Sequence, residues 1–227
     1  MAFNSFEFLV FFPIVVLVFF IIPRKARRLW LLAASYYFYM RWNAVYAALI
    51  AASTLVTYLA GIFISKVSED GSEEKDIEDY DDEEDDDDEA VDNIFHKKFI
   101  LISSIVINLG ILFYFKYFNF ILDTIGNIRS MFGGEPFNPL DIILPVGISF
   151  YTFQAIGYTI DVYRGDVKAE KNFIKYALFV SFFPQLVAGP IVRYADVESE
   201  LLERKPSAVD ISDGITRIVI GLAKKVI

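Results

Sequence analysis

The chain has no cysteine and only one histidine, and these two absences exclude several kinds of chemistry. Without cysteine there is no disulfide framework, no thiolate nucleophile and no cysteine-based metal site. The one histidine, His96, ends an acidic segment and precedes Lys97-Lys98, which favours a plain surface role over that of a general base. No metal-ligand spacing, phosphate-binding glycine motif or Ser/His/Asp arrangement occurs, so we assign no catalytic residue, no metal and no cofactor.

Acidic residues are concentrated in one segment. Between Glu69 and Asp92 stand 17 acidic residues and one lysine, a local charge of −16, which leaves +7 for the rest of a chain whose total is −9. The segment has no apolar period, and such composition predicts a solvated, disordered cytoplasmic loop. The basic residues flank apolar runs instead of forming one face, so nucleic acid is not implied as a partner.

Apolar residues are abundant, at 55% of the 227 residues with 23 phenylalanines, and they form runs long enough for membrane crossings. The run Phe8–Ile22, lengthened by Phe3 and Phe6, predicts a first crossing of about 20 residues. The basic cluster Arg24–Arg28 follows this run, which predicts an uncleaved anchor with the N-terminus outside and the cluster in the cytoplasm.

A helical hairpin is expected next. Leu29–Met40 predicts a short helix, Trp42-Asn43 a tight turn, and Ala44–Ile64 a longer return. Phe99–Phe120 then crosses outward, because Lys97-Lys98 before it marks the cytoplasmic side.

Prolines and glycines interrupt the remaining apolar runs. Asp123–Asp141 predicts an external loop with a short amphipathic helix, and Pro145 opens a crossing at Val146–Val162. A simple crossing at Tyr176–Val192 would place the basic residues after it outside, against the positive-inside rule. The Gly189-Pro190 break therefore favours a segment that enters the membrane and returns.

These segments together predict an all-α, polytopic helix bundle of the cell membrane with short and re-entrant helices. Its parts are N-terminal transmembrane helices at 1–65, an acidic disordered cytoplasmic loop at 66–98, transmembrane and re-entrant core helices at 99–192, and a cytoplasmic amphipathic segment at 193–227. In the last part, Asp210 and Ser212 are expected as helix caps. The final helix has no terminator before the chain ends, which is typical of a fragment.

Polar side chains on one helical stripe point to an interior site. On a helix from Val146, the stripe holds Gly147, Tyr151, Gln154, Tyr158 and Asp161. Such groups are costly at membrane depth. The stripe is open to two interpretations, hydrogen bonding between helices or the lining of a substrate passage.

A second group of candidates follows on the broken segment. Pro184 frees a backbone carbonyl, and Gln185 stands beside it with donors and an acceptor. Arg193 lies at the expected cytoplasmic mouth, where it either meets a phosphate or carboxylate or serves as a positive-inside anchor. The candidates for lining a passage are Tyr151, Gln154, Tyr158, Gln185 and Arg193.

Two long motifs, ILPVGISFYTFQAIGYTIDVYRG and FFPQLVAGPIVRY, resemble the signature stretches of membrane-bound O-acyltransferases, in the alginate O-acetyltransferase branch. The opening FNSFEFLVFFPIVVLVFFIIP, the segment LLAASYYFYMRWNAVYAALIAASTLVTYLAG and the closing GLAKKVI are also similar to that branch. The resemblance covers nearly the whole chain except the acidic segment and corresponds to the N-terminal half of the family fold. The relative that transfers D-alanine to teichoic acids resembles it less.

The resemblance implies a multi-helix enzyme with a funnel through a thinned membrane. Such an enzyme takes an acyl group from a cytoplasmic thioester, such as acyl-CoA, and passes it to an extracytoplasmic polysaccharide or a partner acetyltransferase. Alginate or a similar exopolysaccharide is the implied acceptor, and membrane lipid is a further partner. The family's catalytic histidine lies in the second half of a chain about twice as long, and His96 does not match it, so no catalytic residue is carried over.

Three other functions stay open at this point. One is D-alanyl transfer to teichoic acid. Another is transport or flipping of a solute, since secondary transporters also bind their substrates at broken helices with polar groups. The third is a non-catalytic membrane scaffold that recruits a partner through its acidic segment.

Overall fold

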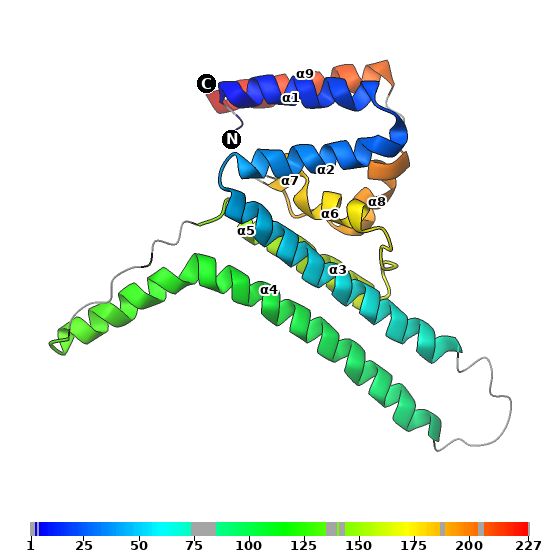
Figure 1. Cartoon of the computed structure of the whole chain (residues 1–227), viewed down its shortest axis with the longest axis vertical. Helices are drawn as coiled ribbons and strands as arrows, with labels where there is room; N and C mark the ends of the chain where they lie inside the picture. The colour runs from blue at the N-terminus through cyan, green and yellow to red at the C-terminus, as the bar shows by residue number, and fades with distance from the viewer. Residues whose placement is uncertain are drawn as a thin grey trace.

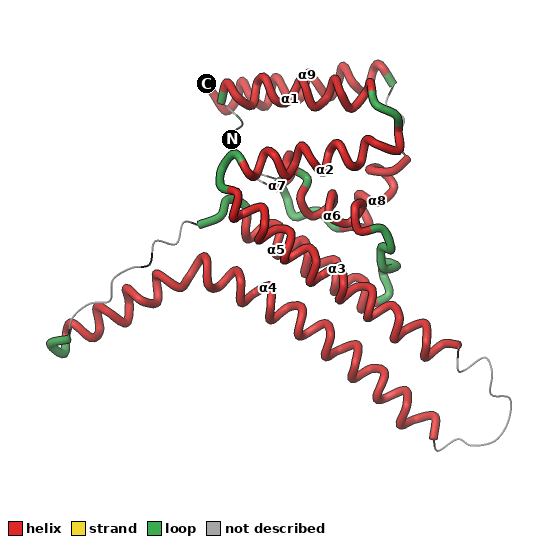
Figure 2. The backbone as a smooth tube through the Cα atoms, viewed as in Figure 1, coloured by secondary structure: helices red, strands yellow, loops and turns green. Residues whose placement is uncertain are grey.

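The computed structural model describes residues 3, 5–73, 85–134, 140, 144–186, 189–203 and 207–226. In this part of the chain the regular structure is helical, as predicted (Figure 2). The helices are α1 (Phe6–Ile21), α2 (Arg24–Met40), α3 (Ala44–Glu73), α4 (Asp85–Met131), α5 (Ile148–Arg164), α6 (Phe173–Ser181), α7 (Phe183–Leu186), α8 (Tyr194–Glu203) and α9 (Ala208–Val226).

Among the residues that the structure describes, two helices are long and apolar enough to cross a membrane, at Ala44–Ser68 in α3 and at Asp92–Met131 in α4. The stretches Phe6–Ile21 and Phe173–Leu186 are apolar but shorter. The all-α membrane fold predicted from the sequence is thereby confirmed.

The first two helices differ in length from the prediction. α1 has 16 residues, because the Ser5 hydroxyl caps its start and Ile22 is extended ahead of Pro23. It is therefore shorter than the predicted crossing of about 20 residues. α2 begins at Arg24 and has 17 residues, so it takes in the basic cluster that was predicted to precede it. Arginine and lysine are good helix formers, and Pro23 sets the start. The predicted turn at Trp42-Asn43 is confirmed.

α4 is longer at both ends than the sequence predicted, and Figure 1 shows it as the long, bent helix at the edge of the molecule. The loop predicted at 66–98 is helical up to Glu73 and again from Asp85, and its middle lies outside the described residues. The extension of α3 to Glu73 and that of α4 back to Asp85 both follow because a helix that is already nucleated adds residues at low cost. For the same reason α4 continues beyond Asp123 to Met131, where an external loop was predicted.

A glycine motif ends α4. The Gly133 N–H donates to the Ser130 carbonyl at 3.1 Å and the Gly134 N–H to the Arg129 carbonyl at 3.0 Å, while Gly133 has φ +80°. This pair of bonds is a Schellman motif, which needs a left-handed residue that glycine adopts without strain. The boundary therefore comes from a local glycine signal and not from the end of the apolar run.

The core lies where α3, α4 and α5 contact one another, with α2 and α6 packed against α3 (Figure 1). A polar seam runs through it. The Ser53 hydroxyl donates to the Asn108 side-chain oxygen, and the Tyr176 hydroxyl donates to the Thr57 hydroxyl at 2.7 Å. These four side chains are at most 1% exposed, so they tie α3, α4 and α6 together inside the bundle.

The N-cap of α9 is Ser207. The sequence had predicted Asp210 and Ser212 as helix caps, and this prediction was wrong. The Asp210 N–H donates to the Ser207 hydroxyl at 3.2 Å, and a carboxylate oxygen of Asp210 accepts from the Ser207 N–H at 2.9 Å. This reciprocal pair is a capping box, in which the cap residue and the residue three positions later each accept from the other's backbone N–H. Asp210 is thus the partner of the cap, and α9 begins at Ala208, two residues before Asp210.

Candidate functional site

Two of the predicted candidates, Gln154 and Gln185, lie where a helix breaks between α6 and α7. We call this region the broken-helix junction; it consists of Phe179, Phe182, Phe183 and Pro184, with the side chains that hydrogen-bond to them. α6 ends at Ser181 because Phe182 is extended, with φ −60° and ψ 110°, and α7 begins at Phe183. Pro184 has no N–H and its ring crowds the preceding turn, so α6 does not extend into it, and Pro184 instead stands in the first turn of α7. The sequence placed the break at Gly189-Pro190; the structure has a first break earlier.

Three side chains satisfy the backbone groups that the break releases. The Phe183 N–H donates to the Ser35 hydroxyl of α2 at 3.3 Å instead of to the helix. The carbonyl of Phe179 then accepts from the Gln154 amide of α5 and from the Gln185 amide, each at 3.0 Å. The sequence predicted a carbonyl freed by Pro184 beside Gln185, but the carbonyl that Gln185 bonds is that of Phe179, which is free because the Phe183 N–H turns to Ser35. Ser35 was missed because it lies 148 residues away in sequence.

The two glutamines therefore join helices at this junction. Gln154 is 5% exposed and Gln185 is half-buried, and neither lines the cavity between α1 and α2 or the small cavity beside Tyr39. This geometry is the hydrogen bonding between helices that the sequence left open as one alternative. That these residues line a passage stays a prediction.

Replacing the glutamines tests their shared acceptor. Gln154→Met or Gln185→Met alone should lower the free energy of unfolding by about 0.6 kcal/mol, the average for such membrane bonds, because the other amide still bonds the carbonyl. The double variant leaves a buried carbonyl unpaired and should cost about 1–3 kcal/mol beyond the two single effects. Thermal unfolding in detergent measures this, and strictly additive effects would contradict the shared acceptor.

Gly147 behaves as predicted for a glycine that lets another group approach the backbone. It has φ +78°, and a Cβ built there would lie 2.6 Å from the Leu186 carbonyl oxygen and 2.8 Å from the Tyr39 hydroxyl. The Tyr39 hydroxyl donates to the neighbouring Val146 carbonyl at 2.8 Å. The end of α2, the start of α5 and the end of α7 thus meet at one glycine.

The stripe on α5 faces the interior. Tyr151 and Tyr158 are at most 1% exposed, and Asp161 is half-buried. The Tyr151 hydroxyl is buried without a hydrogen-bond partner in the described part of the chain. The Tyr158 hydroxyl accepts from the Glu170 N–H at 2.8 Å, and its ring packs against that of Tyr176 at an interplanar angle of 41°, with centroids 4.4 Å apart. Within the described residues, Tyr151 is therefore the phenol of the stripe whose hydroxyl makes no hydrogen bond at all.

Arg193, the remaining candidate, lies apart from this junction. Its side chain is exposed at the start of α8, and among the described residues it has no side-chain partner. Both predicted roles, an anion contact or a positive-inside anchor, remain predictions.

A charged cluster that the sequence did not reveal lies after α5. The Glu170 carboxylate contacts the Lys175 ammonium and accepts from the Tyr194 hydroxyl at 2.6 Å, and Lys175 also bonds Glu198 at 3.0 Å. Burial alone would raise the pKa of Glu170, but the hydrogen bonds from Lys175, from Tyr194 and from the Asn172 N–H lower it more. The cluster ties the loop before α6 to α8; no motif marks such a set in the sequence.

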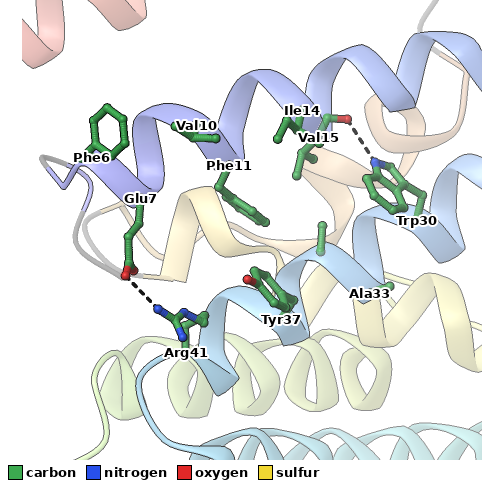
Figure 3. A pocket seen from close by; sticks show the side chains of 11 residues that line it. Phe6, Glu7, Val10, Phe11, Ile14, Val15, Trp30, Ala33, Tyr37 and Arg41 are labelled. Carbon is green, nitrogen blue, oxygen red and sulfur yellow. Dashed lines mark hydrogen bonds and ion pairs between the residues drawn. The ribbon is translucent and has the colours of Figure 1, made fainter.

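Near α2, the described part of the chain forms a large open cavity and a very small one. The larger, of about 650 Å³, lies between α1 and α2, where Figure 3 shows the Phe11 and Tyr37 side chains turned toward one another. Its other lining residues are Phe6, Glu7, Val10, Ile14, Val15, Trp30, Ala33, Ala34 and Arg41. The smaller, of about 10 Å³, lies beside Tyr39 and Val146 and is barely large enough for one water molecule.

No acid–base catalyst stands at the junction. His96 is exposed on α4, with its Nδ1 2.8 Å from the Asp92 carbonyl, as expected of a surface histidine. Within the described ranges, no group of three or more His, Asp or Glu side chains is placed to hold a metal ion. What the junction offers chemically is a set of hydrogen-bonding groups around a kinked backbone.

Comparison with known proteins connects this architecture with named relatives. The chain is 38% identical over all of its 227 residues to the probable alginate O-acetylase AlgI of Pseudomonas putida and 36% identical to that of Pseudomonas aeruginosa. It is 28% identical, over 96% of its length, to the peptidoglycan O-acetyltransferase of Helicobacter pylori. It spans 42%, 39% and 42% of these three relatives, which is about two fifths of their length.

No family model and no solved structure matches the chain. The identity to the alginate O-acetylases, by contrast, extends over the whole chain and so includes both of the long motifs that carried the predicted resemblance. Together with its two long apolar helices, this identity makes the chain a membrane protein. Over the stretch that it spans, the chain is therefore similar to proteins named as probable alginate O-acetylases, in agreement with the resemblance to membrane-bound O-acyltransferases predicted from its motifs.

Proposed function

We propose that the protein takes part in O-acetyl transfer to an extracytoplasmic polysaccharide, alginate or a similar exopolysaccharide. The observation that carries this proposal is the identity of 34–38% over the whole chain to five proteins named as probable alginate O-acetylases. The donor is a cytoplasmic acyl thioester such as acyl-CoA, and the acceptor is the polymer itself or a partner acetyltransferase that hands the group on.

The orientation of the chain follows from its basic residues. The N-terminus lies outside, and the acidic segment between α3 and α4 lies in the cytoplasm, because Arg24–Arg28 and Lys97-Lys98 flank the cytoplasmic ends of the crossings. In this orientation α5 ends on the cytoplasmic side, near the Glu170–Lys175 cluster. The start of α5 at Gly147 faces outward, so the broken-helix junction lies between the two sides.

The junction provides positioning and not acid–base chemistry. Acyl transfer needs a base at the acceptor hydroxyl and hydrogen-bond donors where negative charge develops on the acyl oxygen. The buried and unpartnered Tyr151 hydroxyl is the group that supports a donor role here. None of the junction residues is a general base, so we expect the 227-residue chain expressed alone to transfer no acyl group.

Loss of the gene tests the proposal directly. Deleting it from its host should remove the O-acetyl groups from the secreted polysaccharide, because no other step in the proposal attaches them. Acetate released by mild base from the purified polymer measures the effect, and plasmid-borne expression of the whole gene is the control. Unchanged acetate in the deletion strain would overturn the proposal.

Peptidoglycan is a second candidate acceptor, because one relative is named as a peptidoglycan O-acetyltransferase. The same deletion strain distinguishes the two. If peptidoglycan is the acceptor, the base-labile acetate is lost from the isolated cell wall, and the secreted polysaccharide keeps its own.

A further inference from the structure

The cavity between α1 and α2 is shaped for an amphiphilic molecule. Its volume of about 650 Å³ falls inside the usual range for ligand pockets, about 300–1,000 Å³. Its walls include Val10 and Ile14, which are 45% and 52% exposed, and the small side chain of Ala33, which leaves room beside α2. Apart from one end, these walls are apolar (Figure 3).

That one end is charged. The Arg41 guanidinium bonds the Glu7 carboxylate at 2.7 Å, with the two side chains 48% and 54% exposed. The other end is closed by the Trp30 indole N–H, which donates to the Val15 carbonyl at 3.0 Å (Figure 3). The cavity thus combines a long apolar body with a single polar end.

The charged end lies at a membrane surface. Glu7 is in the first turn of α1 and Arg41 directly follows α2, so both lie where this hairpin leaves the apolar region. Tyr37 and Trp42, which are 49% and 47% exposed, are of the aromatic type that is enriched at the boundary between lipid and water. The apolar body of the cavity therefore extends into the hydrocarbon layer.

We propose that this cavity binds the headgroup and one acyl chain of a phospholipid with an ammonium headgroup, of the phosphatidylethanolamine class. One of its two acyl chains lies along Val10, Ile14 and Ala33, and the other extends into the surrounding lipid. Arg41 has five N–H donors and uses one on Glu7, so the others bind the phosphate. The second carboxylate oxygen of Glu7 accepts from the ammonium.

The charges select this headgroup. The ion pair has one positive and one negative charge, which complements a zwitterion with phosphate and ammonium groups side by side. A glycerol headgroup brings no cation for Glu7, and a choline headgroup brings no N–H donor. Phosphatidylethanolamine should therefore be retained in preference to phosphatidylglycerol and phosphatidylcholine.

Native mass spectrometry of the full chain tests the binding. The chain is reconstituted with equal amounts of phosphatidylethanolamine, phosphatidylglycerol and phosphatidylcholine, and the adducts that survive detergent transfer are counted. One phosphatidylethanolamine per chain is expected. Ala33→Phe fills the cavity and should lower this adduct about tenfold, which corresponds to about 1.4 kcal/mol. Ala48→Phe is the matched control, because Ala48 is exposed on α3 outside the cavity and should leave the adduct unchanged.

A headgroup variant gives an independent readout. Glu7→Gln removes the ammonium partner and leaves Arg41 uncompensated, so the bound lipid should change from phosphatidylethanolamine to phosphatidylglycerol. Equal retention of all three lipids by the unaltered chain, or equal loss in Ala33→Phe and Ala48→Phe, would overturn the proposal. The assay needs no acyl transfer, so its outcome is separate from that of the gene deletion.

Discussion

Gly147→Ala is expected to destabilise the protein by about 2–5 kcal/mol. The left-handed backbone at this position, with φ +78°, costs any residue with a Cβ about 1–2 kcal/mol. The new methyl group also meets the Leu186 carbonyl and the Tyr39 hydroxyl at less than 3 Å, and relieving such overpacking costs about 1–3 kcal/mol more. The first of these neighbours is backbone, so the junction must open for the methyl group to fit.

Gly165→Ala is the matched control. Gly165 has almost the same backbone angle, φ +79°, but nothing lies within 4 Å of a Cβ built there. Its substitution should therefore cost only the backbone strain. Thermal unfolding of both variants in the same detergent measures the difference, and equal losses would show that the close approach at Gly147 contributes nothing.

Lys175→Met is expected to cost about 3 kcal/mol, at the lower end of the range for breaking a buried ion pair. The side chains of Lys175 and Glu170 are only 12% and 11% exposed, so the carboxylate left behind regains little water. Glu170→Gln in the same background removes the uncompensated charge and should recover part of the loss. Chemical denaturation of the two single variants and the double variant measures the coupling, expected at about 1–3 kcal/mol; additive effects would contradict the pairing.

The same pair predicts a dependence of stability on pH. The pKa of Glu170 is lowered below its ordinary value of 4.5, so the folded state favours the charged carboxylate. The contribution of the pair is therefore complete above pH 4.5 and is lost as the pH falls through the lowered pKa of the folded state. The unfolding midpoint should fall more steeply below pH 4.5 in the unaltered protein than in Glu170→Gln.

Local signals in the sequence account for much of the fold. Apolar runs placed the crossings within α3 and α4, and Trp42-Asn43 marked the hairpin turn. The ends of α4 were missed, because hydrophobicity reports where lipid contacts the chain and not where a helix stops. There the chain stays helical until Gly133 allows the left-handed turn.

The candidate site was predicted only in part. The helical stripe correctly predicted that Tyr151, Gln154 and Tyr158 face the interior, and that another group approaches the backbone closely at Gly147. The partners of these residues were not foreseen. The Gln154 amide donates to the Phe179 carbonyl, 25 residues away in sequence. The Ser35 hydroxyl accepts from the Phe183 N–H, 148 residues away. A periodic pattern identifies which face of a helix is buried. It does not identify which backbone group a break in another helix leaves without its hydrogen-bond partner.

By itself, the sequence determined that this is an all-helical membrane chain, because apolar runs, prolines and glycines act through the nearest few residues, and its two long motifs indicated the resemblance to the alginate O-acetylases. Only the tertiary structure decided that two glutamines share the Phe179 carbonyl, that Glu170 is held by Lys175 and Tyr194, and that Glu7 and Arg41 close one end of an apolar cavity. Each of these contacts needs groups that the folded chain brings within hydrogen-bonding distance. Such distances depend on how whole helices pack, which no local pattern contains.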